Sequence, residues 1–459
     1  MTRTLIRCGW LITMDEALGD LAGAEILVEG DRIAAVGHRL GAEAETVIDA
    51  SDMIVLPGLV NMHLHTFQAG LRAIGSEWLA PDYFRHFYGD IATRFGPEDN
   101  YLGTLFGALN QLDGGVTTLF DYCHNIRSLE QAERSVDALA DAGLRAVFVH
   151  GDGLREPAAP GRLPERRLHP RERVVALVDS RFSGAGKAAH GGRVTLALGI
   201  AGPHWADWEA SLANVRLARD LGLLASSHVT KARRDAVVPD GYDRLAAMGL
   251  LGPDHNLVHC NLLDEEEIGR LLDAGCSITS TNMNELHDYP HGSALTKVRA
   301  RGGMPSIGID VEPMVSGDMW REMQMALLFA RNRGIRERAA AGLGPTMIRS
   351  REALGWATVG GAQALGMADT IGRLKPGFKA DLIMLRSDDL NLFPVHDPVY
   401  AAVEQAHAGN VDTVMVDGVL RKQAGRLLFP ADRRRALGEA LTASAARLMA
   451  EAGYRPAPA

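Results

Sequence analysis

Between residues 53 and 369 the chain alternates short apolar runs with longer stretches rich in Ala, Leu, Glu and Arg, and it does so eight times. Apolar runs of this length predict buried β-strands, and the stretches between them predict helices. The runs are Ile54–Met62, Val116–Asp121, Leu144–His150, Val194–Ile200, Leu223–His228, Asn256–His259, Ser277–Ser280 and Pro305–Asp310. Eight strand–helix units in about 300 residues match an α/β fold, the (β/α)8 TIM-like barrel. A doubly wound sheet is the alternative, and polar residues at the strand ends favour the barrel.

Both ends of the chain show a different pattern, with short β-rich runs separated by turns such as Gly30-Asp31 and Asp417-Gly418. The runs are Thr4–Met14, Ala24–Glu29, Arg32–Val36, Leu382–Leu385 and Val411–Val416. We expect the two ends, residues 1-52 and 370-430, to share one small β-sandwich domain beside a barrel of residues 53-369. Ala431–Glu451 predicts an amphipathic helix within a last segment, residues 431-459.

Residues 151-192 are richer in Pro, Arg and Gly than their surroundings. We interpret them as a long insertion at the mouth of the barrel, or as a surface loop. Their arginines either face solvent or meet an anionic substrate.

Charge and cysteine usage exclude several classes of protein. Acidic residues outnumber basic ones by 57 to 48, and no basic run occurs, so nucleic acid and anionic lipid are poor partners. No apolar stretch approaches the roughly 18 to 20 residues of a membrane span, and the start of the chain does not resemble a signal peptide. Four cysteines in 459 residues do not make a disulfide framework. We therefore expect a cytoplasmic protein with reduced thiols.

Two histidines follow the first run closely, in the sequence Pro57-Gly-Leu-Val-Asn-Met-His63-Leu-His65. Residues two apart in a strand point the same way, so both imidazoles would enter the barrel from one strand end. Two neutral imidazoles suit zinc or iron. The alternative is a pair of hydrogen-bonded histidines with no metal.

Other polar residues end later runs of the predicted barrel. His228 ends the fifth run, His259 the sixth and Asp310 the eighth. Barrel enzymes carry their catalytic groups at the C-terminal ends of the strands, so these side chains are expected to meet His63 and His65. Polar groups that follow apolar runs into a core need partners, and a metal ion supplies one.

These residues carry a resemblance to a known family. The chain resembles the amidohydrolase superfamily, in its mononuclear cytosine-deaminase-like and triazine-hydrolase-like branch. The matching features are the segment Pro57–His65, the strand ends at His228, His259 and Asp310, and the segment Gly372–Leu382, which is similar to the family's G-x-L-x-P-G-x-x-A-D-L element. The resemblance runs from about residue 4 to residue 430.

The resemblance implies one divalent metal ion, with zinc as the first expectation and Fe, Mn or Co as alternatives. It assigns His63, His65 and His228 as ligands and Asp310 as a fourth, weakly held ligand that takes a proton from the attacking water. His259 would orient that water or polarise the substrate. The chain lacks the lysine that ends the fourth strand in binuclear relatives, which favours a single metal. Relatives are commonly homo-oligomers, and the same is expected here.

One position departs from the family pattern. Deaminases of this branch carry a glutamate three residues after the fifth-strand histidine, where it protonates a ring nitrogen, and this chain has Lys231 there. The lysine either binds a substrate carboxylate or developing negative charge, or it extends into solvent. In both cases ring deamination lacks its usual acid, and Glu285 is a possible replacement. Further candidates for the substrate pocket are Gln68, Asp121, His124, His204, Trp205 and Asn282.

The leading hypothesis is a metal-dependent hydrolase of non-peptide C–N bonds in a small molecule, of the amide, urea, carbamate or amidine type. An alternative is an aminohydrolase or dehalogenase of an N-heterocycle such as a triazine, purine or pyrimidine. A hypothesis from another class is an inactive scaffold. The intact set of four histidines and Asp310 argues against the scaffold, which has no need of them.

Overall fold

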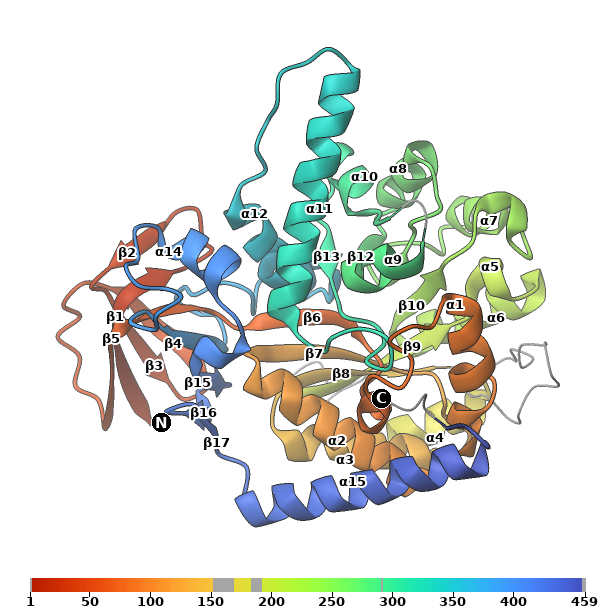
Figure 1. Cartoon of the computed structure of the whole chain (residues 1–459), viewed down its shortest axis with the longest axis horizontal. Coiled ribbons are helices and arrows are strands. Elements are labelled where there is room, and N and C mark those ends of the chain that lie inside the picture. Colours follow the sequence, from red (N-terminus) through yellow and green to blue (C-terminus); the bar gives the residue numbers. More distant parts are fainter. Residues whose placement is uncertain (1, 152–168, 183–191, 290–291, 456–459) are drawn as a thin grey trace.

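The computed structural model describes residues 2–151, 169–182, 192–289 and 292–455. They form two β-sheets that lie beside one another (Figure 1): a parallel sheet of eight strands and a mainly antiparallel sheet of nine. The first sheet confirms the predicted barrel, and the second confirms a separate β-structure built from both ends of the chain.

The barrel strands follow one another in sequence order around the sheet. They are β6 (Leu59–Leu64), β7 (Val116–Cys123), β8 (Arg145–His150), β9 (Val194–Ile200), β10 (Leu224–Val229), β11 (His255–His259), β12 (Ser277–Ser280) and β13 (Ser306–Ile307). The backbone beyond β13 closes the barrel against β6: the N–H groups of Ile309 and Asp310 both donate to the His63 carbonyl, at 2.9 Å each. The His65 N–H donates to the Asp310 carbonyl at 3.1 Å.

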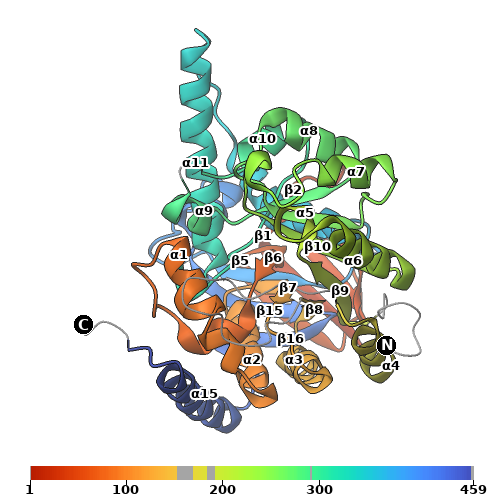
Figure 2. The ribbon, with the colours of Figure 1, turned by 90° about the vertical axis from the view of Figure 1, so that its right-hand side faces the viewer.

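Helices surround the barrel strands, as the view in Figure 2 shows. The longer ones are α2 (Pro97–Asp113), α3 (Leu129–Ala142), α4 (Arg171–Arg181), α6 (Trp208–Leu221), α7 (Gly241–Ala247), α8 (Glu265–Asp273), α9 (Asn282–Asp288), α10 (Leu295–Ala300), α11 (Met319–Ala340) and α12 (Ser350–Gly355). Shorter turns of helix are η1 (Thr66–Leu71), α1 (Ala80–Asp82), η2 (Tyr83–Tyr88), η3 (Ile91–Arg94), α5 (Gly202–Trp205), η5 (Arg233–Asp235), η6 (Trp356–Gly360) and α13 (Gly361–Ala364). None of the helices in the described ranges combines the length and apolarity that crossing a membrane requires.

The segment interpreted as an insertion, residues 151-192, contains one of the barrel helices. Helix α4 follows β8 and precedes β9, and it buries Val174 and Leu177. The interpretation as a surface loop therefore does not hold for this helix. Residues 152–168 and 183–191 of the predicted insertion lie outside the described residues.

The second sheet has the order β17-β16-β15-β14-β5-β1-β3-β4, with β2 paired to β1. Its strands are β1 (Arg3–Ile12), β2 (Asp20–Ala22), β3 (Glu25–Glu29), β4 (Arg32–Gly37), β5 (Thr46–Pro57), β14 (Leu382–Arg386), β15 (Val411–Val416), β16 (Val419–Gln423) and β17 (Arg426–Leu427). Strand β5 pairs with β1 in parallel and with β14 antiparallel, so it joins the two ends of the chain. Short helical turns lie between β14 and β15: α14 (Pro398–Tyr400), η7 (Ala401–Gln405) and η8 (Ala408–Asn410).

The first apolar run, predicted as one strand over Ile54–Met62, divides between the two sheets. Strand β5 ends at Pro57 and β6 begins at Leu59. Gly58 lies between them, and a Cβ there would lie 2.0 Å from Thr117 Oγ1 on β7. The chain passes from one sheet to the other at a residue whose missing side chain allows this close approach.

A buried ion pair joins the barrel to the terminal sheet. Arg145 at the start of β8 donates to Asp381 from Nε at 2.8 Å and from Nη2 at 3.3 Å, and Nη2 also contacts Asp417. Arg145 and Asp381 are only 5% and 4% exposed. Asp381 is the aspartate of the Gly372–Leu382 element, so that element has a structural role at this junction.

The C-terminal helix α15 (Ala431–Glu451) has the predicted bounds. It packs along α2, where Ser444 and Arg447 both hydrogen-bond to Asp99. Figure 1 shows it running across the barrel helices, far in sequence from the segments it covers.

Candidate metal centre

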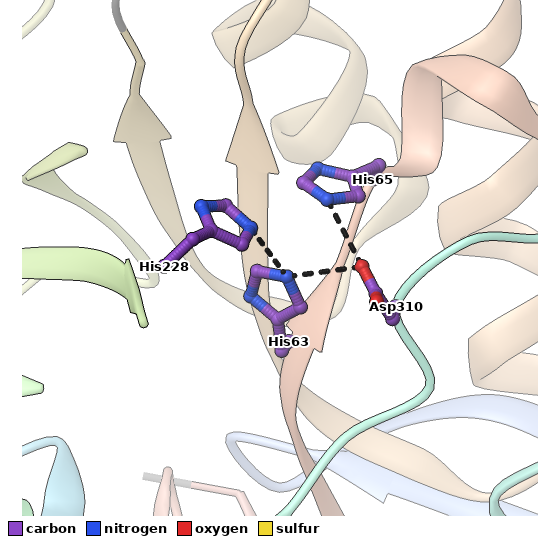
Figure 3. Close-up of side chains that lie close together, drawn as sticks. All are labelled: His63, His65, His228 and Asp310. Carbon is purple, nitrogen blue, oxygen red and sulfur yellow. Dashed lines mark hydrogen bonds and ion pairs between the residues drawn. The ribbon is translucent and has the colours of Figure 1, made fainter. Parts of the chain in front are cut away.

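Three imidazoles and a carboxylate converge at the C-terminal ends of the barrel strands (Figure 3). His63, His65, His228 and Asp310 each offer one ligand atom, and these four atoms lie within 4.8 Å of one another. His63 Nε2 lies 3.1 Å from His228 Nε2 and 3.2 Å from Asp310 Oδ1. His65 Nε2 lies 3.1 Å from the same oxygen. One cation at the centre of this group would be within reach of all four atoms.

The barrel geometry explains why these four residues meet. The alternation of β6 turns His63 and His65 to the same side, as expected from their spacing. His228 lies near the end of β10, and Asp310 follows β13, which closes the barrel beside β6. The segment after the last strand approaches β6 closely: a Cβ on Gly308 would lie 2.5 Å from the backbone nitrogen of His63. Glycine is therefore required at position 308.

Two of the residues at these strand ends have an uncommon backbone conformation. His259 has φ 74° and Asp310 has φ 81°. Both lie in the left-handed region of backbone conformation, which residues other than glycine rarely adopt. Such strain persists where the surrounding structure fixes it, and it concentrates at functional sites. The strand ends are thus held in a conformation that aims both side chains at the cluster.

The protonation states suit a metal ion. Burial lowers the pKa of His63 to about 4 and holds that of His228 well below its usual range. Burial alone would raise the pKa of Asp310, but the close imidazoles of His63 and His65 and the nearby His259 hold it well below its usual value. Neutral imidazoles and an ionised carboxylate are the forms that bind divalent metals.

The tautomer of His65 is set by a neighbouring carbonyl. Its Nδ1 lies 2.6 Å from the carbonyl oxygen of Tyr122. Because a carbonyl only accepts, Nδ1 carries the proton and the lone pair of Nε2 faces the cluster. A hydrogen bond of this kind behind a histidine is the usual support for a metal ligand. The donor set therefore fits one divalent ion, which when bound lowers the pKa of a water molecule and promotes its attack on a substrate.

His259 lies beside the cluster but outside its four ligand atoms. Its Nδ1 lies 3.2 Å from Glu285 Oε1 and 3.1 Å from Thr281 Oγ1, and its Nε2 lies 3.7 Å from Asp310 Oδ2. Burial lowers the pKa of His259, but Glu285 and Asp310 outweigh that effect and raise it. His259 can thus present a proton or a positive charge to a substrate.

The position of Glu285 differs from the one expected of a replacement acid. Its side chain is fully buried on the far side of the His259 ring, where it also accepts from the Thr281 N–H at 3.0 Å. It is not among the residues that line the substrate cavity. Glu285 therefore contacts His259 and does not reach the cavity.

Asn284 is a site residue that the sequence interpretation missed. Its Nδ2 donates to Asp310 Oδ2 at 2.6 Å. The residue selected instead, Asn282, donates its backbone N–H and its Nδ2 to Glu322, at 2.6 and 2.8 Å, and does not line the cavity. The sequence indicated this position only through the two asparagines in Thr281–Glu285. Which of the two faces the cluster depends on where α9 begins, and it begins at Asn282.

A cavity with an empty volume of about 660 Å³ opens over the cluster. Its lining is mainly aromatic, with the cluster residues and a few polar groups at one side. The lining residues are His65, Ala80, Tyr83, Phe84, Tyr88, Tyr122, His124, Trp205, His228, Thr230, His259, Asn284, Asp288, Tyr289, Asp310, Val311 and Met314. A mainly aromatic cavity with a few polar groups at one side is typical of a small-molecule site.

The other predicted pocket residues divide into two groups. His124 and Trp205 line the cavity as expected. Gln68 lies one layer behind it and donates to the Tyr83 hydroxyl at 2.9 Å. Asp121 accepts from the backbone and the hydroxyl of Thr66, and His204 lies in a separate surface pocket. The structure thus does not bring Gln68, Asp121 or His204 to the cavity wall.

Lys231 lies next to the cavity, against one of its aromatic walls. Its Nζ is 4.1 Å from the centre of the Trp205 ring, in the geometry of a cation–π contact. Its charge also contributes to the low pKa of His204, which burial and Lys231 together lower to about 4. The lysine is thus held by Trp205 and does not simply extend into solvent.

A (β/α)8 barrel with a three-histidine, one-aspartate cluster at its strand ends belongs to the class of metal-dependent barrel enzymes. The chain is a member of the Amidohydrolase family, whose model matches residues 54–421. The resemblance inferred from the sequence is thereby confirmed. The protein is a hydrolase of C–N bonds other than peptide bonds, which sets aside the scaffold hypothesis.

Comparisons with individual proteins agree with this membership. A 5'-deoxyadenosine deaminase of Methanosarcina mazei is 26% identical over 453 residues, which cover 97% of this chain and 98% of the relative. A 5-methylthioadenosine/S-adenosylhomocysteine deaminase of Symbiobacterium thermophilum is 29% identical over 434 residues, 91% of this chain and 93% of the relative. Both are similar over nearly their whole length.

A solved structure is also similar. An atrazine chlorohydrolase variant from Arthrobacter aurescens, in complex with zinc and atraton, has a TM-score of 0.82 and 25% identity, and the match covers 96% of this chain and 100% of the other. Its zinc agrees with the expectation of one divalent metal ion, and with zinc as the first choice.

Proposed function

We propose that the protein removes an exocyclic amino group from a flat N-heterocycle and releases ammonia. The observation that carries this proposal is the wall of the cavity, where Tyr83, Phe84, Tyr88, Trp205 and Tyr289 surround a space next to the metal cluster. Aromatic faces bind planar rings by stacking. The deaminase names of the two relatives support the same reaction class.

In this proposal His63, His65, His228 and Asp310 hold the metal ion. Asp310 Oδ2, which does not face His63 or His65, takes a proton from the attacking water and passes it to the leaving nitrogen. His259, whose pKa is raised by Glu285 and Asp310 against the effect of burial, donates a hydrogen bond that stabilises negative charge on the reacting group. The geometry that supports these roles is the separation of the two Asp310 oxygens, one facing the imidazoles and one facing His259 and Asn284.

A second candidate is hydrolysis of an exocyclic amide, urea or carbamate bond. Lys231 favours it, because an ammonium replaces the glutamate that relatives of this branch use on a ring nitrogen. A substrate with a carboxylate would meet that charge beside Trp205. We rank this candidate second because the cavity wall is mainly aromatic.

The test is a substrate panel measured with the purified, zinc-loaded protein. Ammonia release is followed with adenosine, 5'-deoxyadenosine, 5'-methylthioadenosine, S-adenosylhomocysteine and an amino-substituted triazine, and amine release is followed with anionic and neutral amides and ureas. Chloride release from a chlorotriazine tests dehalogenation. We expect ammonia release from at least one aminated heterocycle and none from Asp310→Asn protein. Turnover confined to amides or ureas would replace the first candidate by the second.

We also propose that the protein forms a homo-oligomer in the cytoplasm, as the resemblance implies. Light scattering on the eluted protein tests the first point, and fractionation of the native host tests the second.

A further inference from the structure

The proposed deamination needs a proton at the ring nitrogen next to the carbon that is attacked. When water adds to that carbon, electrons move onto the ring nitrogen, and an acid that protonates it lowers the barrier. The family position for this acid holds Lys231, whose ammonium lies on the Trp205 ring. The proton must therefore come from another side chain in the cavity wall.

Asp288 is a carboxyl group in that wall, at the last position of α9. It lines the same cavity as His259 and Asp310. One of its oxygens, Oδ2, accepts a hydrogen bond from the backbone N–H of Ala80, which fixes the side chain. The other, Oδ1, is buried and has no hydrogen-bond partner among the described residues. A buried polar atom without a partner beside a cavity is what a ligand group would satisfy.

Helix α9 brings three side chains to the site. Asn284 contacts Asp310, Glu285 contacts His259, and Asp288 lines the cavity. Residues 284 and 288 are four apart and so share one face of the helix. Helix α9 thus holds two side chains that contact the metal cluster or His259, and it also places the Asp288 carboxyl group in the wall of the cavity.

The environment of Asp288 raises the pKa of its carboxyl group. Burial raises its pKa, and the charge of Asp310 adds to that effect, while the Ala80 N–H and the two histidines His287 and His259 oppose it without cancelling it. A raised pKa suits a carboxyl group to the role of proton donor better than the pKa of an ordinary exposed aspartate does.

We propose that Asp288 is the acid that protonates the ring nitrogen of the substrate, in place of the glutamate that is absent at position 231. This inference rests on the proposed deaminase function. The Asp288 O–H bond breaks and a ring N–H bond forms while the water oxygen bonds to carbon, and one water proton moves to Asp310. That proton then passes to the amino group, the exocyclic C–N bond breaks, and ammonia leaves. The remaining hydroxyl proton returns to the Asp288 carboxylate as the ring carbonyl forms, so the enzyme is unchanged and no other reactant is used.

The decisive variant is Asp288→Asn, studied in the full-length, zinc-loaded protein with the best aminated heterocycle of the panel. Asparagine keeps an oxygen that accepts from the Ala80 N–H, but it has no proton to transfer. We expect kcat to fall at least about 100-fold, with KM within about threefold and with zinc content and Tm unchanged. Asp288→Glu, which keeps the acid, should retain kcat within about tenfold. Asp273→Asn, the matching exposed aspartate at the end of α8, should have no effect.

Each other outcome overturns the inference. A kcat of Asp288→Asn within threefold of the wild type would exclude proton transfer by this residue. Equal losses of kcat in Asp288→Asn and Asp288→Glu would show that the shape of the side chain matters and its proton does not. Loss of zinc or a lower Tm in Asp288→Asn would show a structural role. If the wild-type protein is inactive on every aminated heterocycle, the proposed function itself is wrong. If the wild type is active and Asp288→Asn is equally active, only the role of Asp288 is wrong.

Discussion

The side-chain nitrogen of Asn284 lies 2.6 Å from Oδ2 of Asp310 and donates a hydrogen bond to it. The other oxygen of the carboxylate, Oδ1, faces His63 and His65. The hydrogen bond therefore gives the two oxygens different environments, and it fixes the rotation of the carboxylate about its own axis. Asn284 thus helps to orient Asp310 from the side opposite His63 and His65.

Asn284→Ala should lower kcat about 10- to 100-fold, the usual effect of removing a group that orients a metal ligand. The measurement is steady-state ammonia release, with zinc content determined by atomic absorption. Asn332→Ala, on the exposed side of α11, is the control and should behave like the wild type. Unchanged turnover of Asn284→Ala would show that Asp310 keeps its orientation without this bond.

Asp310→Asn should abolish turnover while most of the zinc stays bound. The three imidazoles remain as ligands, but the amide cannot take a proton from the attacking water. Zinc content per chain and kcat, measured on the same preparation, separate the two effects. Residual turnover above about 1% of the wild type would mean that another group takes the proton from the attacking water. His259 would then be the first candidate to test.

Removal of the metal should lower both activity and thermal stability. A ligand that binds only the folded state at 100 times its Kd stabilises it by about 2.7 kcal/mol, so dialysis against a chelator should lower Tm and zinc should restore it. Differential scanning calorimetry of apo and zinc-loaded protein measures the shift. In His63→Ala protein added zinc should produce little or no shift, and an equal shift there would place the bound ion elsewhere.

Arg145→Met should destabilise the fold by about 3–5 kcal/mol, because it leaves the buried carboxylate of Asp381 without its cation. Urea unfolding followed by circular dichroism measures the change. Arg171→Met removes an exposed ion pair with Asp220 and should cost at most about 1 kcal/mol. A similar small loss for Arg145→Met would mean that water reaches the junction and solvates the two aspartates.

Gly308→Ala should weaken metal binding more than it weakens the fold. The added Cβ would lie 2.5 Å from the backbone nitrogen of His63, so the segment from Gly308 to Asp310 must move away from β6. Zinc affinity is measured by competition with a chromophoric chelator. Gly334→Ala on α11 meets no atom within 4 Å and should be neutral or stabilising by about 0.5–1 kcal/mol. Wild-type zinc affinity in Gly308→Ala would show that the barrel closes without this close approach.

The sequence was sufficient to predict the barrel, most strand positions and the convergence of four polar strand ends. Val194–Ile200, Ser277–Ser280 and Val411–Val416 have the predicted bounds. These predictions depend on local periodicity and on the rule that parallel strands end at one edge, and both hold for any barrel of this kind. The passage from β5 to β6 at Gly58 was not predicted. A single apolar run supplies strands to both sheets, and only tertiary packing shows where the first strand ends and the second begins.

Contacts behind the cluster could not be predicted either. The hydrogen bonds from Asn284 to Asp310 and between Glu285 and His259 depend on where α9 begins and how it turns. A shift of one residue along a helix rotates every side chain by about 100°. The choice between Asn282 and Asn284, and the burial of Glu285, are therefore beyond a prediction from spacing alone.

The pairing of β5 has a consequence for the synthesis of the protein. During translation β5 finds its first partner, β1, at once, but its other edge pairs with β14, which leaves the ribosome only after the whole barrel has been made. Until then the backbone groups of β5 on that side stay unpaired, and an open strand edge invites pairing with other chains. A chain that ended before β14 would therefore keep one edge of β5 open to pairing with other chains.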